Sequence, residues 1–584
     1  MKNSVETINL LSYKIKNPLK LRKLVILSVI TLILNSSSVI FGILYISLPF
    51  YSTLWDIFGI IIPIALFENL LFVYFNLHKK NLFQMRTRIY SYGYLVIIMF
   101  TLVFMMLGNL LLSVTYSNAL IENLGAYLLI YFSYFGSLIY GIAFSLLNIK
   151  ILHRKDVSIH QFSILFSKSK NFSRLKKNLR RIITILSRIT FYIGLIFGIV
   201  IMFGSFEVVT TFIAIVSGQF GLFFSLIFLS NTILLLKLKR RKRTTRRYHR
   251  TAILGLFISG CLLMPLFLTN VSVQNMGKTF SNAFGSDWEE KIPSQVNNLF
   301  LKTPFSLPGY FLGSHPKDSR IERNILYYDN EGIRLYFDVY MPLNGNKDLP
   351  GENSTIIRIH GGSWVSGDKG MMNMMQMNKY FAAQGYIVFD IQYGLDSNPL
   401  YALDPLTPVY KKGNFNIDDM MRHIGEFTKY LSKNADEYGA NLDSVFFSGG
   451  SSGGHLTSAV ALAISSGNYT DIFGGNLTIK GLVPFYPANG AMRFFGITGT
   501  KEFTNPEGLI DHNSPPTLIF QGTHDILNYF GISENFRKTY LSKGNQECAI
   551  LWMPFAGHAS DFYFSGYYNQ IFLYYMERFL YLYH

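Results

Sequence analysis

Seven long apolar segments, separated by short polar connections, fill the first 270 residues and constrain the fold more than any other feature of the sequence. A helix that crosses a bilayer needs about 20 mostly apolar residues. The segments that reach this length are 24–48, 54–76, 92–113, 124–148, 182–204, 208–236 and 251–269. The fifth is the weakest of the seven predicted membrane helices because it contains Arg188. Only 15% of the 584 residues are charged, whereas a soluble protein carries about 25%. An ordinary cytosolic enzyme, a disordered chain and a coiled coil are therefore excluded.

Lysine and arginine are concentrated in alternate connections between these apolar segments. The basic clusters lie at 14–23, 79–88, 150–181 and 237–250, and the other connections hold almost none. Residues 1–280 carry a net charge of +25 and residues 281–584 carry −7, which together give +18. Because cytoplasmic loops are enriched in Lys and Arg, we expect a cytoplasmic N-terminus and an extracytoplasmic location for everything after residue 270. The expected partner of the basic residues is the lipid bilayer, and no nucleic-acid partner is expected.

One acidic residue lies well inside an apolar segment. Glu68, followed by Asn69, falls within the second predicted membrane helix. A charged group in a bilayer is costly and is often functional. The simpler interpretation is a hydrogen bond to a polar residue of another helix, and the sequence does not assign Glu68 a further role.

The second half of the chain changes character after a predicted juxtamembrane linker, 271–319. Short apolar runs now alternate with amphipathic runs. The predicted strands are 324–329, 333–341, 355–360, 386–393, 444–448, 479–485, 516–521 and 548–553, and the predicted helices are 370–384, 416–438, 452–465, 530–542 and 564–581. Two initial strands followed by β–α alternation predict an eight-stranded, mostly parallel sheet with flanking helices. The last helix is aromatic enough to suggest an eighth span, but Glu577 and Arg578 favour a helix docked on the sheet.

A serine lies in a glycine-rich turn between a predicted strand and a predicted helix. The segment SVFFSGGSSGGHLT, residues 444–457, fits the G-x-S-x-G nucleophile elbow in two frames, one centred on Ser451 and one on Ser452. The turn must be sharp, so small residues are needed on both sides of the nucleophile. We predict Ser451 as the nucleophile because the strand ends near Phe447 and Ser452 opens the helix.

A second glycine motif follows another predicted strand. The segment IIRIHGGSWVSGDK, residues 356–369, places Gly361 and Gly362 directly after the strand. Backbone N–H groups in such a loop stabilise the oxyanion of acyl transfer. We predict an oxyanion hole formed by Gly361, Gly362 and the N–H of Ser452. His360 is expected to hold the loop by hydrogen bonds and not to act as the base.

Two further strand ends present an acid and a base. Asp525 follows the predicted strand 516–521, and His558 follows the strand 548–553. A histidine that takes the serine proton and a carboxylate that orients the histidine complete a catalytic triad. The competitors that we weighed are Asp561 for the acid, and His524 and His512 for the base. No metal or cofactor is expected, since Cys261 and Cys548 are too far apart for a metal-binding spacing.

These motifs give residues 320–584 a resemblance to the α/β-hydrolase superfamily, close to the hormone-sensitive-lipase-like and feruloyl-esterase-like carboxylesterases. The HGGSW…SGDK and GGSSGGHL blocks resemble that group's HGGGW…SGDK and GHSAGGHL. The resemblance implies a serine hydrolase without a metal, with Ser451, Asp525 and His558 as the triad. Ser363 replaces the third glycine of the family motif, and Gly394 stands where many relatives carry arginine. No family is recognised for residues 1–280.

Taken together, the sequence predicts a multi-pass membrane domain over 1–270, the linker 271–319 and an α/β-hydrolase domain over 320–584. The expected function is a membrane-anchored extracytoplasmic carboxylesterase that acts through an acyl-enzyme. A serine peptidase or amidase of the same fold is an alternative. A membrane transport or sensor protein with a ligand-binding hydrolase-like domain is another. The substrate is expected to be an ester outside the membrane: an acetylated surface polysaccharide, a lipid or an aryl ester. The segments 486–514 and 395–415 are expected to border the site.

Overall fold

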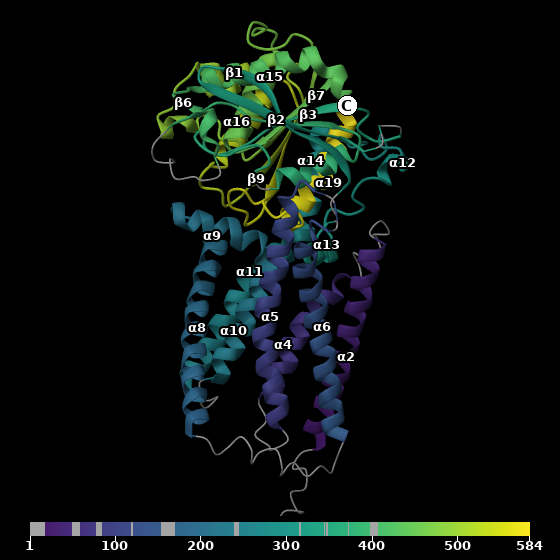
Figure 1. The fold of residues 1–584 in the computed structure, drawn as a ribbon, viewed down its shortest axis with the longest axis vertical. Helices are drawn as coiled ribbons and strands as arrows, with labels where there is room; N and C mark the ends of the chain where they lie inside the picture. Colours follow the sequence, from purple (N-terminus) through teal and green to yellow (C-terminus); the bar gives the residue numbers. More distant parts are fainter. Residues whose placement is uncertain are drawn as a thin grey trace, which may run out of the picture. The chain divides into compact units, whose positions relative to one another are not determined.

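A computed structural model describes residues 18–48, 59–77, 84–117, 119, 121–153, 170–238, 245–314, 317–343, 345, 348–371, 373–397 and 407–584. The start of the second predicted apolar segment, parts of three basic connections (78–83, 154–169 and 239–244) and residues 398–406 of the segment 395–415 lie outside these ranges. The N-terminal helices are α2 (Pro18–Ser47), α4 (Ile61–Asn76), α5 (Gln84–Ser113), α6 (Leu124–His153), α8 (Lys170–Phe203), α9 (Val208–Gln219), α10 (Gly221–Leu238) and α11 (Arg246–Phe284) (Figure 1).

Several of these helices are apolar over the length of a bilayer. In the described part of the chain six qualify by length and composition, namely α2, α5, α6, α8, α10 and α11. The described part of α4 has 16 residues and that of α9 has 12, and both are apolar but shorter. The predicted apolar segments therefore correspond to helices, except that the sixth, 208–236, is divided into α9 and α10.

The division at Phe220 has a physical cause in tertiary contacts. Gln219 Nε2 donates both to Ile215 O of its own helix, at 2.6 Å, and to Ala559 O, at 2.9 Å. A Cβ added to Gly221 would lie 2.4 Å from Leu262 O, so only glycine allows α10 to approach α11 this closely. An apolar pattern records neither contact, and for this reason the sequence predicted one continuous helix.

The chain separates into two compact units that do not coincide with the change in composition. One comprises Met1–Met105, Tyr131–Gly194 and Leu226–Phe257, and the other comprises Met106–Ile130, Leu195–Ser225 and Ile258–His584. The ends of α5, α6, α8, α10 and α11, together with all of α9, therefore belong to the same unit as the sheet.

Inside the first unit, polar side chains pair between α2 and α4. Glu68 Oε1 accepts a hydrogen bond from Thr31 Oγ1 at 2.7 Å. The amides of Asn35 and Asn69 bond to each other in both directions at 2.8 Å. The hydrogen bonding between helices expected for Glu68 and its neighbour is therefore present.

The sheet holds eight strands in the order β1-β2-β4-β3-β7-β8-β9-β10. Their bounds are β1 (Ser319–Asn330), β2 (Ile333–Pro342), β3 (Ser354–Ile359), β4 (Ile387–Ile391), β7 (Asn441–Gly450), β8 (Ile479–Phe485), β9 (Thr517–Gly522) and β10 (Cys548–Met553). β2 runs antiparallel to β1 and β4, and every later pairing is parallel. The predicted eight-stranded, mostly parallel sheet is confirmed. A two-residue pair, β5 (Leu395–Asp396) with β6 (Lys412–Gly413), was not predicted.

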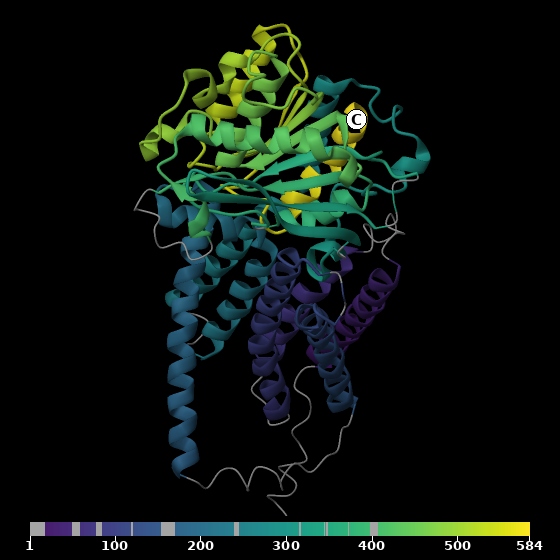
Figure 2. The same ribbon diagram turned by 45° about the horizontal axis from the view of Figure 1, so that its top comes forward.

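Helices cover both faces of this sheet (Figures 1 and 2). The main ones are α14 (Met374–Ala382), α15 (Ile417–Tyr438), α16 (Ser452–Ser465), α18 (Gly531–Ser542) and α19 (Tyr567–Tyr583). Side chains that alternate along β2 show which helices cover which face of the sheet. Phe337 and Val339 join the core cluster that includes residues of α15 and α16. On the opposite face, Asn378 of α14 bonds to Asp390 of β4, and Phe579 of α19 packs on Phe446 of β7.

The C-terminal helix α19 docks on the sheet as expected, with Phe572 against Phe485 and Phe520, and it contains a buried ion pair. Glu577 and Arg578 contact each other at 2.8 Å and are almost completely buried. The Glu577 carboxylate also accepts from Tyr380 OH, Gln384 Nε2 and Leu301 N. The helix therefore fixes α14 and the segment around Leu301. The region expected to be a linker is partly helical, since α11 continues to Phe284, and α12 (Ser294–Asn297) and α13 (Leu307–Leu312) follow.

Candidate active site

Ser451 lies between β7 and α16 in a strained backbone conformation. Its φ is 59° and its ψ is −121°, a region that non-glycine residues rarely adopt and that is typical of functional turns. The turn is tight because the end of β3 lies against it. A Cβ added to Gly449 would lie 2.4 Å from Ile359 O, and one added to Gly453 would lie 2.2 Å from the same oxygen. The glycines around the serine are therefore a steric requirement.

The structure brings Ser451, His558 and Asp525 into one hydrogen-bonded line. His558 Nε2 lies 3.1 Å from Ser451 Oγ, and His558 Nδ1 lies 2.9 Å from Asp525 Oδ2. Since a carboxylate can only accept, Nδ1 carries the proton and Nε2 is free to accept the serine hydroxyl proton. β9 leads to the aspartate and β10 to the histidine, so adjacent parallel strands deliver both groups to the same sheet edge. This is the arrangement that a serine nucleophile requires.

The surrounding backbone fixes the Asp525 carboxylate. Its Oδ1 accepts from the N–H groups of Leu527 and Asn528, both at 3.0 Å, and the side chain is fully buried. Oδ2 therefore remains directed at His558. This loop conformation was not predicted, although a carboxylate two and three residues before free N–H groups is a common turn pattern.

The competing residues have other partners. Asp561 accepts a hydrogen bond from Tyr486 OH at 2.7 Å, and burial raises the pKa of its carboxyl. His524 Nδ1 pairs with Thr523 Oγ1 at 3.0 Å. His512 accepts from Asn545 Nδ2 through its backbone oxygen. None of these contacts joins a competitor to the serine.

The predicted oxyanion loop lies directly against the serine turn. A Cβ added to Gly361 would lie 2.7 Å from Gly450 O and 3.5 Å from Ser451 Cβ. Gly362 has φ +121°, and a Cβ there would lie 2.0 Å from Ser366 O. Ser452, at the start of α16, is completely buried. Gly361 therefore lies against the serine turn, Gly362 follows it in the loop, and Ser452 follows Ser451; the role of all three as donors stays a prediction.

The substitution of the third family glycine by Ser363 carries a conformational cost. Ser363 has φ 57° and Trp364 has φ 63°, both in the left-handed region. The N–H groups of Val365 and Ser366 bond to Gly362 O at 3.2 and 2.9 Å and close the loop. Trp364 is buried, and its Nε1 lies 3.3 Å from His455 Nδ1. These contacts hold the serine in a conformation in which glycine has no penalty.

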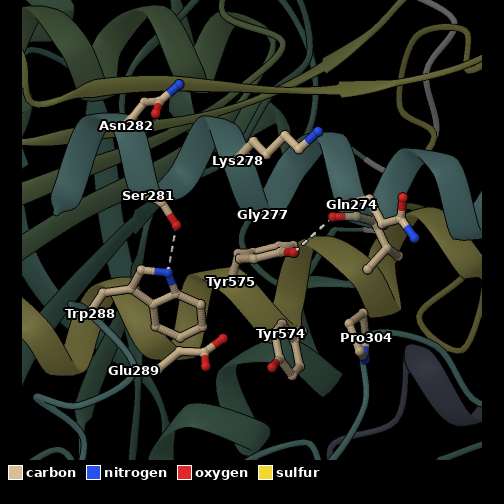
Figure 3. A pocket seen from close by; sticks show the side chains of 11 residues that line it. Gln274, Gly277, Lys278, Ser281, Asn282, Trp288, Glu289, Pro304, Tyr574 and Tyr575 are labelled. Carbon is tan, nitrogen blue, oxygen red and sulfur yellow. Dashed lines mark hydrogen bonds between the residues drawn. The ribbon is translucent and has the colours of Figure 1, made fainter. Parts of the chain in front are cut away.

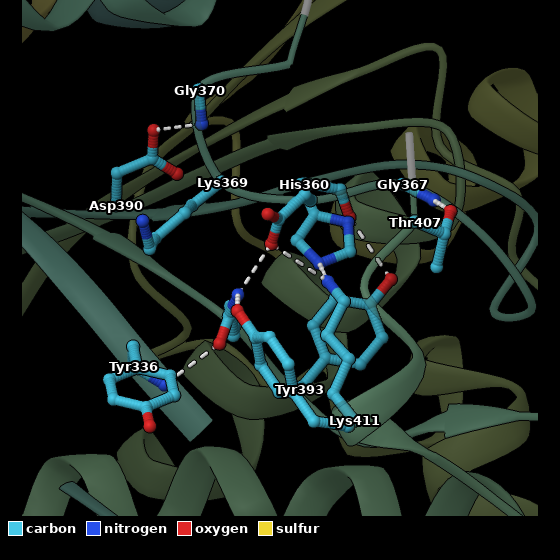
Figure 4. Close-up of polar contacts among 12 residues, drawn as sticks. Tyr336, His360, Gly367, Lys369, Gly370, Asp390, Tyr393, Thr407 and Lys411 are labelled. Carbon is cyan, nitrogen blue, oxygen red and sulfur yellow. Dashed lines mark hydrogen bonds and ion pairs between the residues drawn. The ribbon is translucent and has the colours of Figure 1, made fainter. Parts of the chain in front are cut away.

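A buried polar network lies beneath the oxyanion loop (Figure 4). His360 Nδ1 bonds to Gly361 O at 2.8 Å, and its Nε2 lies 3.0 Å from Lys411 Nζ. Lys411 also pairs with Asp368 at 3.0 Å, and Gln392 Nε2 donates to the same Asp368 oxygen at 2.6 Å. The expected structural role of His360 is present. Lys411 and Gln392 were not predicted as part of this network, because both are distant from the motif along the chain.

Burial controls the protonation of this network. It lowers the pKa of His360 to about 3, with the nearby Lys411 charge adding to the effect. It also lowers the pKa of Lys411 to about 8, against the opposing attraction of Asp368. His360 is therefore neutral at ordinary pH, so its Nε2 accepts from the Lys411 ammonium while its Nδ1–H donates to the loop carbonyl.

Helix α9 holds the loop that follows His558. Gln219 Nε2 donates to Ala559 O at 2.9 Å, and its Oε1 accepts from Tyr563 N. A Cβ added to Gly557 would lie 2.9 Å from Ala214 Cβ. The sequence analysis missed this contact entirely. The one available signal was a glutamine between two glycines, Gly218 and Gly221, inside an otherwise apolar run.

A pocket of about 480 Å³ lies elsewhere in the same unit, between the end of α11 and α19 (Figure 3). Tyr575 OH donates to Val273 O at 3.1 Å, and Trp288 Nε1 donates to Ser281 Oγ at 3.0 Å. None of the six predicted site residues lines it. Within the described residues, no three His, Cys, Asp or Glu side chains lie close enough together to hold a metal ion.

A known protein-family model matches the central part of the sheet. Residues 337–494 match the model of the BD-FAE family, a feruloyl-esterase-like α/β-hydrolase group. This segment runs from β2 past β8 and contains Ser451 and the oxyanion loop, while Asp525 and His558 lie beyond it.

Two curated proteins of Mycobacterium tuberculosis (strain ATCC 25618 / H37Rv) are similar to this chain. "Esterase LipC" is 21% identical over 266 residues, which are 41% of this chain and 60% of that protein. "Probable carboxylic ester hydrolase LipM" is 22% identical over 256 residues, 40% of this chain and 55% of that protein. The chain thus spans a little over half the length of these relatives.

Two inhibited esterases are among the solved structures that are similar to this chain. Thermogutta terrifontis esterase 2 phosphoramylated by tabun is 20% identical, with a TM-score of 0.33, covering 42% of this chain and 87% of that one. Esterase B from Lactobacillus rhamnosis, inhibited by a tributyrin phosphonate, is 21% identical, with a TM-score of 0.34, covering 42% and 80%.

Proposed function

We propose, on the premise that residues 337–494 are a BD-FAE-type α/β-hydrolase segment, that this chain is a membrane-anchored serine carboxylesterase with an extracytoplasmic active site. The observation that carries the proposal is the line of contacts from Ser451 Oγ through His558 to Asp525. The curated relatives, named as an esterase and a carboxylic ester hydrolase, support the ester class.

The chemistry follows from the geometry of the three side chains. Ser451 Oγ attacks the ester carbonyl carbon while His558 Nε2 takes the hydroxyl proton, and Asp525 stabilises the imidazolium. The carbonyl oxygen becomes an oxyanion that the N–H groups of Gly361, Gly362 and Ser452 stabilise. The C–O bond to the alcohol then breaks, and the imidazolium returns the proton to the leaving alkoxide. Water, activated by the same histidine, hydrolyses the acyl-serine.

The location of the site outside the membrane is supported by contacts of the connections between helices. The distribution of Lys and Arg assigns the α5–α6 and α8–α9 connections to the extracytoplasmic side. In the α5–α6 connection, Tyr116 OH donates to Asp338 at 2.8 Å and Thr115 O accepts from Lys379 at 2.8 Å. In the α8–α9 connection, a Cβ added to Gly204 would lie 2.9 Å from His524. Both connections thus contact the hydrolase portion, as this orientation requires.

The proposal is tested with the full-length protein in detergent micelles. A fluorophosphonate probe, which labels activated serines, should react with the wild type and with Ser452→Ala but not with Ser451→Ala. Turnover of a panel of acyl and aryl esters should follow the same order, because only the backbone of Ser452 has a role. If Ser452→Ala is the unreactive variant, the nucleophile is one residue later than proposed. If the probe labels neither the wild type nor either variant, the chain is not a serine hydrolase.

The peptidase or amidase alternative uses the same triad. It is separated by offering one acyl group as both its ethyl ester and its amide. We expect faster turnover of the ester, and the reverse preference would favour an amidase. The transport or sensor alternative predicts ligand binding without turnover by the wild type.

A further inference from the structure

Helix α9, together with Phe206 two residues before it, has an inverted distribution of polar and apolar side chains. The exposed fractions of Phe206, Val209 and Phe212 are 69%, 63% and 65%. Thr210 and Thr211, on the other side, are buried. Between residues 203 and 219 the sole charged side chain is Glu207. A helix in water buries its apolar side and exposes its polar side, so the environment that fits the exposed face of α9 is apolar.

The position of α9 along the chain indicates what that environment is. The helix before it contains the candidate span Asn178–Phe203, and the helix after it is the candidate span Gly221–Leu238. On the proposed topology both spans end at the same surface of the bilayer, and α9 joins them there. An apolar helical face held at that level lies in the interface between headgroups and acyl chains.

The opposite side of α9 contacts the loop that carries His558, and the turn before α9 contacts the loop that carries Asp525. Ala214 lies against Gly557, the residue before His558, and Gln219 bonds to Ala559, the residue after it. The turn before α9 contacts His524, the residue before Asp525. The loop that follows Asp525 exposes further apolar side chains, Ile526, Leu527 and Tyr529. The segment from Gly204 to Gln219, which carries the exposed apolar side chains, is therefore in contact with the loops of both His558 and Asp525.

We propose that α9 lies in the surface of the bilayer, with Phe206, Val209 and Phe212 among the lipids, and that the esterase takes amphiphilic esters with long acyl chains directly from that surface. This inference rests on the proposed function and specifies its substrate class. It favours a lipid ester over a soluble polysaccharide acetate, because a catalytic loop held at the acyl-chain boundary reaches an ester bond located there.

The first experiment compares two esters that share a leaving group, using the full chain in phosphatidylcholine nanodiscs. p-Nitrophenyl acetate is supplied in solution and p-nitrophenyl palmitate within the bilayer. The triple variant Phe206→Ser, Val209→Ser, Phe212→Ser should lose at least about tenfold in kcat/KM for the palmitate, since it loses apolar contact with the lipid. Its rate with the acetate should stay within about twofold, because none of the three side chains is in the triad.

A matched control carries serine at two exposed leucines of the hydrolase portion, Leu326 and Leu343. This control should keep both activities. If the triple variant loses activity equally with both substrates, or keeps full activity with both, the inference is overturned. Fluorophosphonate labelling of Ser451 in each variant shows that the site remains folded.

The second experiment measures the depth of α9 without using turnover. Native Cys261 and Cys548 are buried, so a thiol-reactive NBD fluorophore can be directed to Phe212→Cys. Lys433→Cys serves as the control because it lies on an exposed position of α15, on the sheet face opposite α14 and α19. Nitroxide-labelled phosphatidylcholine should quench the label at 212 and not at 433.

The outcomes separate the two proposals. Quenching at 212 without hydrolysis of either ester would leave the position of α9 supported while the proposed function fails. Hydrolysis of both esters with no quenching at 212 would overturn the inference and leave the proposed function intact. If the label at 212 is unquenched and the protein is dimeric, this face is an interface between two copies, and the inference is overturned.

Discussion

At the scale of single residues, two buried carboxylates lie near the same imidazole and only one is hydrogen-bonded to it. Asp525 is held by two backbone N–H groups and directs its other oxygen to His558. Asp561 is bonded to a tyrosine hydroxyl. Both residues are aspartates close to a strand end, so composition and spacing alone did not separate them. The two aspartates were separated by the order of serine, acid and base along the chain, which only Asp525 satisfies.

Asp525→Asn should lower kcat on the order of 10³–10⁴, because an amide can stabilise the wrong histidine tautomer while keeping the shape. Asp561→Asn is the matched control and should lose less than about tenfold, since its amide oxygen can still accept from Tyr486 OH. Steady-state kinetics of both variants with one aryl ester make the comparison. Equal losses of kcat in the two variants would show that Asp561 also contributes to catalysis.

The network beneath the oxyanion loop predicts an alkaline limit to activity. The pKa of Lys411 is lowered to about 8 by burial, so raising the pH through 8 removes the ammonium that donates to His360 and pairs with Asp368. Activity should fall over this range. Lys411→Met should lose this limb of the pH profile and lower kcat on the order of 10²-fold at pH 7, because the loop is no longer fixed.

The stability change has the opposite sign, which separates loop positioning from unfolding. The folded pKa of Lys411 lies below its unfolded value, so from about pH 8 to about pH 10.4 the unfolded state binds more protons. Stability contributed by this group therefore rises with pH in that window. A fall in activity between pH 7.5 and about 9 without a fall in Tm is the expected result. A parallel fall in Tm would attribute the loss of activity to unfolding.

At the scale of elements, the strand and helix pattern was predictable because it depends on local alternation and capping. Two strands, β8 and β10, have the predicted bounds, and helix α15 begins with the Asn416–Asp419 capping box and ends at the left-handed Gly439. The parts that could not be predicted depend on distant contacts. The break between α9 and α10, the bond from Lys411 to His360 and the extension of α11 to Phe284 leave no periodic signal.

Gln219 offers a test at this scale. Gln219→Leu should lower kcat for a soluble ester on the order of 10–10²-fold, because both hydrogen bonds that locate the loop after His558 are lost. Gln376→Leu is the control, since Gln376 is also buried and donates to a backbone oxygen, that of Ser314, but on α14. Equal loss of activity in the two variants would indicate a general loss of stability, which thermal unfolding would also report.

At the scale of the whole molecule, the charge distribution predicts the topology, and the contacts of the α5–α6 and α8–α9 connections with the hydrolase portion support that prediction. A reporter fused after His584 should respond as extracytoplasmic, and one inserted at residue 243 as cytoplasmic. The physical reason is the cluster of Lys and Arg between residues 237 and 250, which resists transfer across the membrane. If added protease cleaves the hydrolase portion only after the cells are permeabilised, this portion is cytoplasmic and the predicted orientation is wrong.

The contact between Gln219 and the loop of His558 also has a mechanical meaning. On the proposed position among lipids, α9 moves when the membrane is stretched, thinned or curved, and it is bonded to the backbone on one side of His558. A displacement of α9 would reach the imidazole through Gln219 and through the packing of Ala214 on Gly557. The rate of hydrolysis would then vary with the tension of the bilayer, and the protein would sense the physical state of its membrane through the same bonds that align its base.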